Sequence, residues 1–290
     1  MSWTAIARFV TLILIIAVGV VYVRGWRQLH QSPDTDGGDW RHLFSFLVGL
    51  TLLAIVTATP LAGLSTQYFS ARSFQQMVLV ASVPAMLIMA NPLPTLLLGL
   101  PTSTRQTLIT ARDDGRYPTL RRMAYSITAP GVTLIACLSI CWIWYDPRIH
   151  QATLTHGWVH ALEIVSLFAV GLLTWWHISG AWPRPHGLMP PVVRIFYTTI
   201  SIWPLKIAGL ILLFVPTAFY SYPATWQFSG LHINDYAFGA MITWIVGGLA
   251  YAITAILLAR DWLGIEEGKP ILPESAWASD EALLAPGLKQ

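Results

Sequence analysis

The 290-residue chain is 55% hydrophobic and only 11% charged, and its mean hydropathy is +0.58. Soluble domains carry about a quarter charged residues, so this composition excludes an ordinary soluble domain and indicates a protein that lies in lipid. The formal net charge of +3 follows from where basic residues flank the membrane, and it does not indicate a nucleic-acid partner.

The apolar residues form long blocks instead of the alternating pattern of strands. A helix of about 20 apolar residues crosses the roughly 30 Å hydrocarbon core of a bilayer and satisfies its own backbone. In chain order, seven such blocks are Ala5–Val23, Leu43–Leu64, Met77–Leu100, Thr128–Trp144, Val159–His177, Ile195–Pro216 and Tyr236–Leu258. The predicted fold class is all-α: a polytopic membrane protein with a seven-transmembrane-helix bundle.

Arg and Lys residues concentrate in the connections after the first, third and fifth blocks and in the tail. By the positive-inside rule, this predicts the N-terminus outside and the C-terminus in the cytoplasm. No small-residue cleavage site follows the first block, so we expect it to remain as an anchor. Residues 1–263 are predicted to form one transmembrane domain, and 264–290, which are acidic and contain proline, a largely disordered cytoplasmic tail.

Two groups of potential metal ligands fall near the predicted outer surface. His156, His160 and Glu163 are spaced i, i+4 and i+7, which places them on one face of a continuous helix. Two histidines at this spacing can share a metal, and the carboxylate can ligate it or orient an imidazole; the alternative is hydrogen bonding to loop backbone. Cys137 and Cys141 could likewise hold Cu(I), or they are small buried residues.

Lys206 lies mid-way along the sixth block, where an ammonium must pair or reach the interface. We predict an intramembrane ion pair between Lys206 and Glu163. The outer connection before the last block is rich in aromatic residues, and with Asp235, His232 and Tyr145 it forms a predicted outer-face interaction surface. The sequence has no P-loop, nucleophile elbow or HExxH motif, so we do not predict an enzyme.

Several stretches carry a family resemblance: RHLFSFLVGL (Arg41–Leu50), SARSFQQ (Ser70–Gln76), Trp142–Glu163 and NDYAFGAMITWIVGG (Asn234–Gly248). Their order and spacing resemble the CtaG family of bacterial cytochrome c oxidase assembly factors, which are implicated in supplying copper to the oxidase. The resemblance implies a multi-pass protein of the bacterial cytoplasmic (inner) membrane. It also implies that the partners are the lipid bilayer and subunits of a cytochrome oxidase or other respiratory complex, and that the cofactor, if any, is copper.

The chain departs from the family pattern at its histidines. The family's S-A-H-M-x-Q-H has histidines where this chain has Arg72 and Gln76, W-H-x-P becomes W-Y-D-P at 144–147, and H-x-L-E-H becomes H-A-L-E-I at 160–164. Four family histidines are thus Arg72, Gln76, Tyr145 and Ile164, and His160 alone remains. Arginine and isoleucine offer no lone pair to copper, and glutamine is a poor substitute.

These departures leave three functional hypotheses. The protein is an oxidase assembly factor that delivers copper or holds a subunit, or it is a metal-free accessory or structural subunit of a respiratory complex. The third hypothesis is a transporter whose pathway includes Lys206 and Glu163, which the lack of internal repeats and paired broken helices disfavours.

Overall fold

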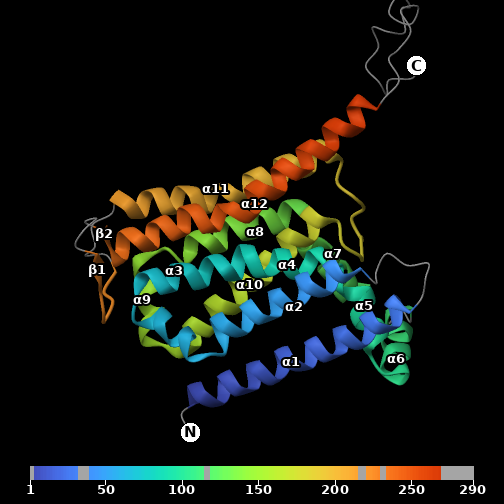
Figure 1. The fold of residues 1–290 in the computed structure, drawn as a ribbon, viewed down its shortest axis with the longest axis horizontal. Helices are drawn as coiled ribbons and strands as arrows, with labels where there is room; N and C mark the ends of the chain where they lie inside the picture. Colours follow the sequence, from blue (N-terminus) through green and yellow to red (C-terminus); the bar gives the residue numbers. More distant parts are fainter. Residues whose placement is uncertain (1–2, 32–38, 114–117, 215–219, 229–232, 269–290) are drawn as a thin grey trace, which may run out of the picture.

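The computed structural model describes residues 3–31, 39–113, 118–214, 220–228 and 233–268, and in these residues the chain is almost entirely helical (Figure 1). Among these residues, six helical segments are long and apolar enough to cross a membrane, and the bent pair Pro118–Ile127 and Pro130–Ile143 makes a seventh if it counts as one span. This confirms the predicted all-helical polytopic membrane protein. The described residues also include a short antiparallel pair of strands, with Gln227 opposite Asn234.

The elements keep the order of the predicted blocks but not all of their boundaries. The third span begins at Phe69 instead of Met77, because its first two turns are polar and do not register as apolar sequence. The helices and strands are α1 (Trp3–His30), α2 (Trp40–Thr57), the 3₁₀ turn η2 (Pro60–Thr66), α3 (Phe69–Met77), the π-helical segment η3 (Val78–Ser82), α4 (Val83–Met89), α5 (Pro92–Gly99), α6 (Thr102–Asp113), α7 (Pro118–Ile127), α8 (Pro130–Ile143), α9 (Pro147–Thr155), α10 (Gly157–Ser179), α11 (Pro191–Phe214), β1 (Gln227–Phe228), β2 (Ile233–Asn234) and α12 (Asp235–Glu267).

The span formed by α3, η3 and α4 is the centre of the bundle. In its most apolar stretch 72% of the residues are buried, against 17% to 39% in the other spans. It packs against α2, α10 and α12, whereas α1 lies at the edge against α2 and α5 (Figure 1). Most side chains of α3 therefore project into protein and not into lipid, and Phe74 is its exposed exception.

A proline explains the π-helical turn in this central span. Pro84 has no N–H, and in a regular α-helix its ring would crowd the carbonyl of Val80. The helix widens over Val78–Ser82, and the Val80 carbonyl accepts a hydrogen bond of 3.3 Å from the Tyr251 hydroxyl of α12. The freed carbonyl is thereby satisfied within the apolar interior, as a membrane protein requires.

The two ends of the bundle differ. Helix α9 and the strands lie at one end, and α5, α6 and the C-terminal part of α12 lie at the other (Figure 1). Asp146 starts α9 by accepting the backbone N–H groups of Arg148 and Ile149 at 2.9 and 3.2 Å. Which end faces outside stays a prediction. Residues 269–290 of the predicted tail lie outside the described residues, and α12 itself continues to Glu267.

Candidate functional site

The start of α3 is held by a side chain from α12. The carboxylate of Asp235 accepts the backbone N–H of Phe69 at 2.8 Å and that of Ser70 at 3.2 Å, and the Ser70 hydroxyl also donates to it. The first N–H groups of a helix have no partner within the helix, and their positive partial charge suits an anion. Asp235 is fully buried, so this contact fixes the position and rotation of α3 inside the bundle.

With α3 held in this way, its polar face meets α10 in a buried ion pair. Arg72 Nη2 lies 2.5 Å from Glu163 Oε2, and both side chains are almost completely excluded from solvent. Gln76, one turn after Arg72, donates its Nε2 to Glu163 Oε1 at 2.6 Å. Both carboxylate oxygens are therefore occupied, which is what keeps a charged carboxylate stable in a buried place.

His160 lies beside this pair on the preceding turn of α10. Its Nδ1 is 2.8 Å from Arg72 Nη1 and 3.2 Å from Glu163 Oε2. A guanidinium nitrogen can only donate, so Nδ1 accepts from Arg72 and the ring proton is on Nε2. The imidazole is 18% exposed. It is thus the part of the cluster that approaches the surface, and only its Nε2 remains for an outside group.

A chain of hydrogen bonds continues from Arg72 into α9. Arg72 Nη2 donates to the Thr153 hydroxyl, which donates to the His150 carbonyl at 2.6 Å. His150 Nδ1 donates to the Trp144 carbonyl at 3.1 Å, and its Nε2 accepts from the Tyr222 hydroxyl at 2.5 Å. Burial, reinforced by the charge of Arg72, lowers the pKa of His150 to about 4, and burial raises the pKa of Tyr222. His150 is therefore neutral at pH 7.

Aromatic side chains close this end of the bundle. The Tyr220 hydroxyl donates to the Tyr145 carbonyl at 2.6 Å, and the Tyr236 hydroxyl donates to the Tyr220 carbonyl at 2.5 Å. The ring of Phe69 packs between Tyr220 and Tyr236, with centroid distances of 5.4 and 5.3 Å. These contacts join the segment before β1 to α3, to the turn between α8 and α9, and to α12.

Of the predicted metal set, His160 and Glu163 are in contact, but His156 does not join them. His156 is the residue before α10 begins, with extended backbone at φ −123°, so the helical spacing that linked it to His160 is broken. Its Nδ1 instead pairs with the Thr155 hydroxyl at 2.8 Å. Across the described part of the chain, no group of three or more His, Cys, Asp or Glu could hold a metal ion. Cys137 and Cys141 are both buried free thiols on α8.

The structure does not bring the predicted ion pair of Lys206 and Glu163 together. Lys206 Nζ donates to the Trp244 carbonyl at 2.5 Å and lies 4.2 Å from the centroid of the Trp244 ring. Lys206 is on α11, which packs mainly against α12, whereas Glu163 faces α3 and is neutralised by Arg72. The Lys206 charge is instead stabilised by the carbonyl dipole and the aromatic face.

Two residues of the predicted outer-face surface are buried. Asp235 caps α3, and the Tyr145 carbonyl accepts a hydrogen bond from the Tyr220 hydroxyl, so both are engaged in contacts within this end of the bundle. The third, His232, lies outside the described residues. The sequence did mark Arg72 and Gln76, but only as replaced family histidines. Their spacing of one turn was the signal that could have shown one buried polar face.

The fold and this site define a class: a polytopic helical membrane protein with a buried cluster of charged and hydrogen-bonding side chains inside one end of its bundle. Comparison with curated proteins finds no match, and comparison with solved structures finds none either. The model of the cytochrome c oxidase caa3 assembly factor family (Caa3_CtaG) matches residues 20–264, which is most of the chain. The protein therefore belongs to the cytochrome c oxidase caa3 assembly factor family.

Proposed function

We propose that this protein assists the assembly of a haem-copper cytochrome oxidase by holding an oxidase subunit in the membrane, and that it does so without binding copper. Family membership supports the assembly role. The observation that carries the metal-free part is the ion pair of Arg72 with Glu163, which puts a permanent cation where the family resemblance implies a histidine.

The chemistry of the cluster opposes a metal ion in three ways. Arg72 stays charged, so it cannot become a ligand, and it already occupies Glu163 and the Nδ1 of His160. A copper ion that took Glu163 would leave the guanidinium buried and without its counter-ion. Removing one partner of a buried pair costs about 3–5 kcal/mol. That cost alone weakens metal binding by roughly two to three and a half powers of ten.

In the proposed function the cluster is structural. It joins α3 to α9 and α10, and Asp235 joins the same end to α12, so four elements are held in one arrangement without a metal. On its opposite face, α10 exposes Trp158, Leu162 and Val165. This face is the one we assign to the transmembrane helix of a subunit, because the cluster holds the other face of the same helix in place.

Metal analysis tests the metal-free part. The purified wild-type protein in mild detergent, supplied with Cu(I), should retain far less than one equivalent after desalting. The matched variant Arg72→His with Gln76→His returns two imidazoles beside His160 and should retain more copper than wild type. One equivalent on the wild type, lost in His160→Ala, would contradict the proposal and favour copper delivery.

The amount of assembled oxidase in cells tests the proposed role in assembly. Deletion of the gene should lower the amount of assembled oxidase on native gels, and added copper should not restore it. Rescue by copper would contradict the proposal. A pull-down separates the accessory-subunit alternative, because an assembly factor is recovered with immature subunits and a permanent subunit is recovered at fixed stoichiometry with the finished complex.

We also propose that the protein lies in the bacterial cytoplasmic membrane with the charge cluster near the outer surface. The support is the distribution of Arg and Lys between connections. Cysteine substitutions at the exposed Arg148 and Arg184, at opposite ends of the bundle, test this with a membrane-impermeant thiol reagent. Labelling of the Arg148 position alone in intact spheroplasts is expected, and the reverse pattern would invert the orientation.

A further inference from the structure

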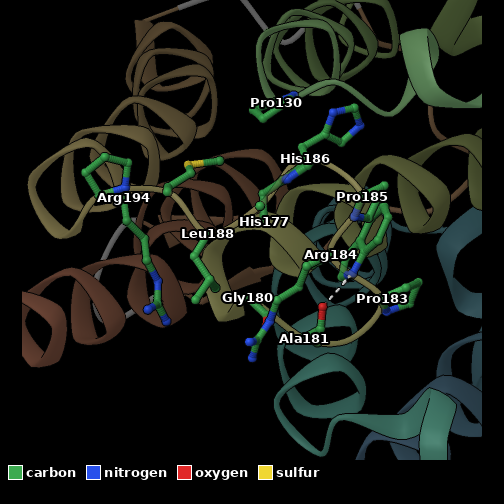
Figure 2. A pocket seen from close by; sticks show the side chains of 14 residues that line it. Pro130, His177, Gly180, Ala181, Pro183, Arg184, Pro185, His186, Leu188 and Arg194 are labelled. Carbon is green, nitrogen blue, oxygen red and sulfur yellow. Dashed lines mark hydrogen bonds between the residues drawn. The ribbon is translucent and has the colours of Figure 1, made fainter.

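A second site lies at the opposite end of α10 from the charge cluster. There the connection from α10 to α11 lines an open pocket of about 190 Å³ (Figure 2). Its titratable lining residues are Arg184, Arg194, His177 and His186, and no Asp or Glu is among the lining residues. Nothing in the oxidase-assembly function assigns a role to this concentration of positive charge.

The two arginines are each fixed along one edge. Arg194 Nε donates to the Ile178 carbonyl and Arg184 Nε donates to the Gly180 carbonyl at 2.6 Å, so both cap the end of α10. Both guanidinium groups point toward the lower part of the view, with the Leu188 side chain between them (Figure 2). Within the part of the chain that the structure describes, the Nη groups of Arg184 and Nη1 of Arg194 have no hydrogen-bond partner. Because Nε anchors each guanidinium group to the end of α10, the remaining N–H donors of both arginines are held in place for an anion.

The histidines connect the pocket to α7. His177 Nε2 donates to the Thr128 carbonyl at 2.8 Å, and His186 Nε2 lies 3.1 Å from the Thr128 hydroxyl. The His186 ring also packs on Tyr125, with centroids 4.2 Å apart. These contacts hold the end of α7, and with it the bend between α7 and α8, against the pocket.

Helix α7 has the composition of a helix that lies on a membrane surface. It bends 62° away from α8 and has no buried residue. Leu120 and Met123 are exposed on it together with the cations Arg121 and Arg122. Exposed apolar and basic side chains on one short helix are typical of contact with the headgroups and upper acyl chains of anionic lipid.

We propose that the pocket binds the phosphate group of an anionic phospholipid from the leaflet at this end of the bundle. Arg184 and Arg194 bind the phosphate oxygens, because guanidinium groups match phosphate geometry and stay charged. The neighbouring Leu188, Val192 and Val193 are 59%, 41% and 50% exposed and provide an apolar rim for acyl chains. A soluble phosphate has the same anionic group but does not use this rim.

One carboxylate acts against this site from outside the pocket. Asp261 of α12 lies close enough to Arg194 to interact with its charge. Its negative charge offsets part of the positive charge that would otherwise attract the lipid phosphate. Removing this carboxylate should therefore strengthen lipid binding without altering either arginine. The proposal can thus be tested by an increase in binding as well as by a loss.

Native mass spectrometry of the full-length protein in detergent micelles tests the proposal. Wild type should retain one phosphatidylglycerol in preference to phosphatidylcholine. The double variant Arg184→Gln with Arg194→Gln should bind phosphatidylglycerol at least tenfold more weakly, because charge-assisted hydrogen bonds are lost. Arg148→Gln, which removes an exposed arginine at the other end, is the matched control and should bind as wild type does.

The variant Asp261→Asn separates lipid binding from a loss of folding, since it should retain several-fold more phosphatidylglycerol than wild type. Unchanged or weaker retention in Asp261→Asn would overturn the proposal. So would equal retention of phosphatidylcholine, or undiminished binding in the double arginine variant. If inorganic phosphate alone raises the thermal stability as much as phosphatidylglycerol does, the site belongs to a soluble anion and the lipid assignment is wrong.

Discussion

The ion pair between Arg72 and Glu163 makes a quantitative prediction about the stability of the bundle. The perturbation is a double-mutant cycle with Arg72→Met, Glu163→Gln and both together. Each single substitution leaves one charge buried with no counter-ion, because both side chains are almost completely excluded from solvent. The double variant removes both charges and keeps side chains of similar volume.

The expected free energies follow from burial. Each single substitution should lower the free energy of unfolding by about 3–5 kcal/mol. Arg72→Met also leaves the Thr153 hydroxyl and His160 Nδ1 without their donor, which places it at the upper end of that range. Because the double variant buries no unpaired charge, its cost should be lower than the sum of the two by about 2–4 kcal/mol.

Unfolding of the purified protein in mixed detergent micelles, followed by circular dichroism as the denaturing detergent fraction rises, measures each corner of the cycle. The matched control is Lys206→Met combined with Glu163→Gln. Lys206 contacts Trp244 and not Glu163, so these two should add within about 0.5 kcal/mol. Additive costs for Arg72 and Glu163, or a large coupling between Lys206 and Glu163, would refute the reasoning from this structure.

Three further predictions use the same measurement. Because the folded protein keeps His150 neutral down to its pKa of about 4, while the unfolded chain binds a proton near pH 6.5, stability should fall as the pH drops through this window. The loss between pH 7 and pH 5 is about 2 kcal/mol, and His150→Gln should remove it. Asp235→Ala should cost about 2–4 kcal/mol, since it leaves buried N–H groups at the start of α3 unpaired; a loss under 1 kcal/mol would show that the cap is dispensable. Gly209→Ala should cost about 1–3 kcal/mol because its Cβ would lie 2.7 Å from the Trp244 backbone nitrogen, whereas Gly131→Ala, which meets nothing within 4 Å, should change stability by less than about 0.5 kcal/mol. Equal effects of the two alanines would contradict the close approach of α11 and α12.

Some of the four positions at which the family resemblance implies a histidine are neighbours in the structure. The side chains at two of those positions, Arg72 and Gln76, both contact Glu163, and His160, which remains, contacts both members of the ion pair. Arg72, Gln76 and His160 therefore form one connected set of contacts around Glu163. A change at any one of them leaves a buried polar group without a partner, which explains why a partial return to histidine is expected to be less stable than either complete arrangement.

The sequence by itself determined the membrane class, the approximate number of spans and the family resemblance. Crossing a bilayer depends on the apolar character of about 20 consecutive residues, which is a local property that the sequence shows directly. The same local test placed the start of the third span at Met77, because the polar turns that contain Arg72 and Gln76 do not look like membrane sequence. Those turns are helical because other helices, and not lipid, surround them.

Only the tertiary structure decided which charges meet. Lys206 and Arg72 were both available to Glu163, and the choice depends on how α3, α10 and α11 are rotated and packed, which involves residues far apart in the chain. The helix start after His156 likewise removed it from the face that its spacing from His160 predicted. Burial makes such pairings strong, and burial is a property of the assembled bundle and not of any one segment.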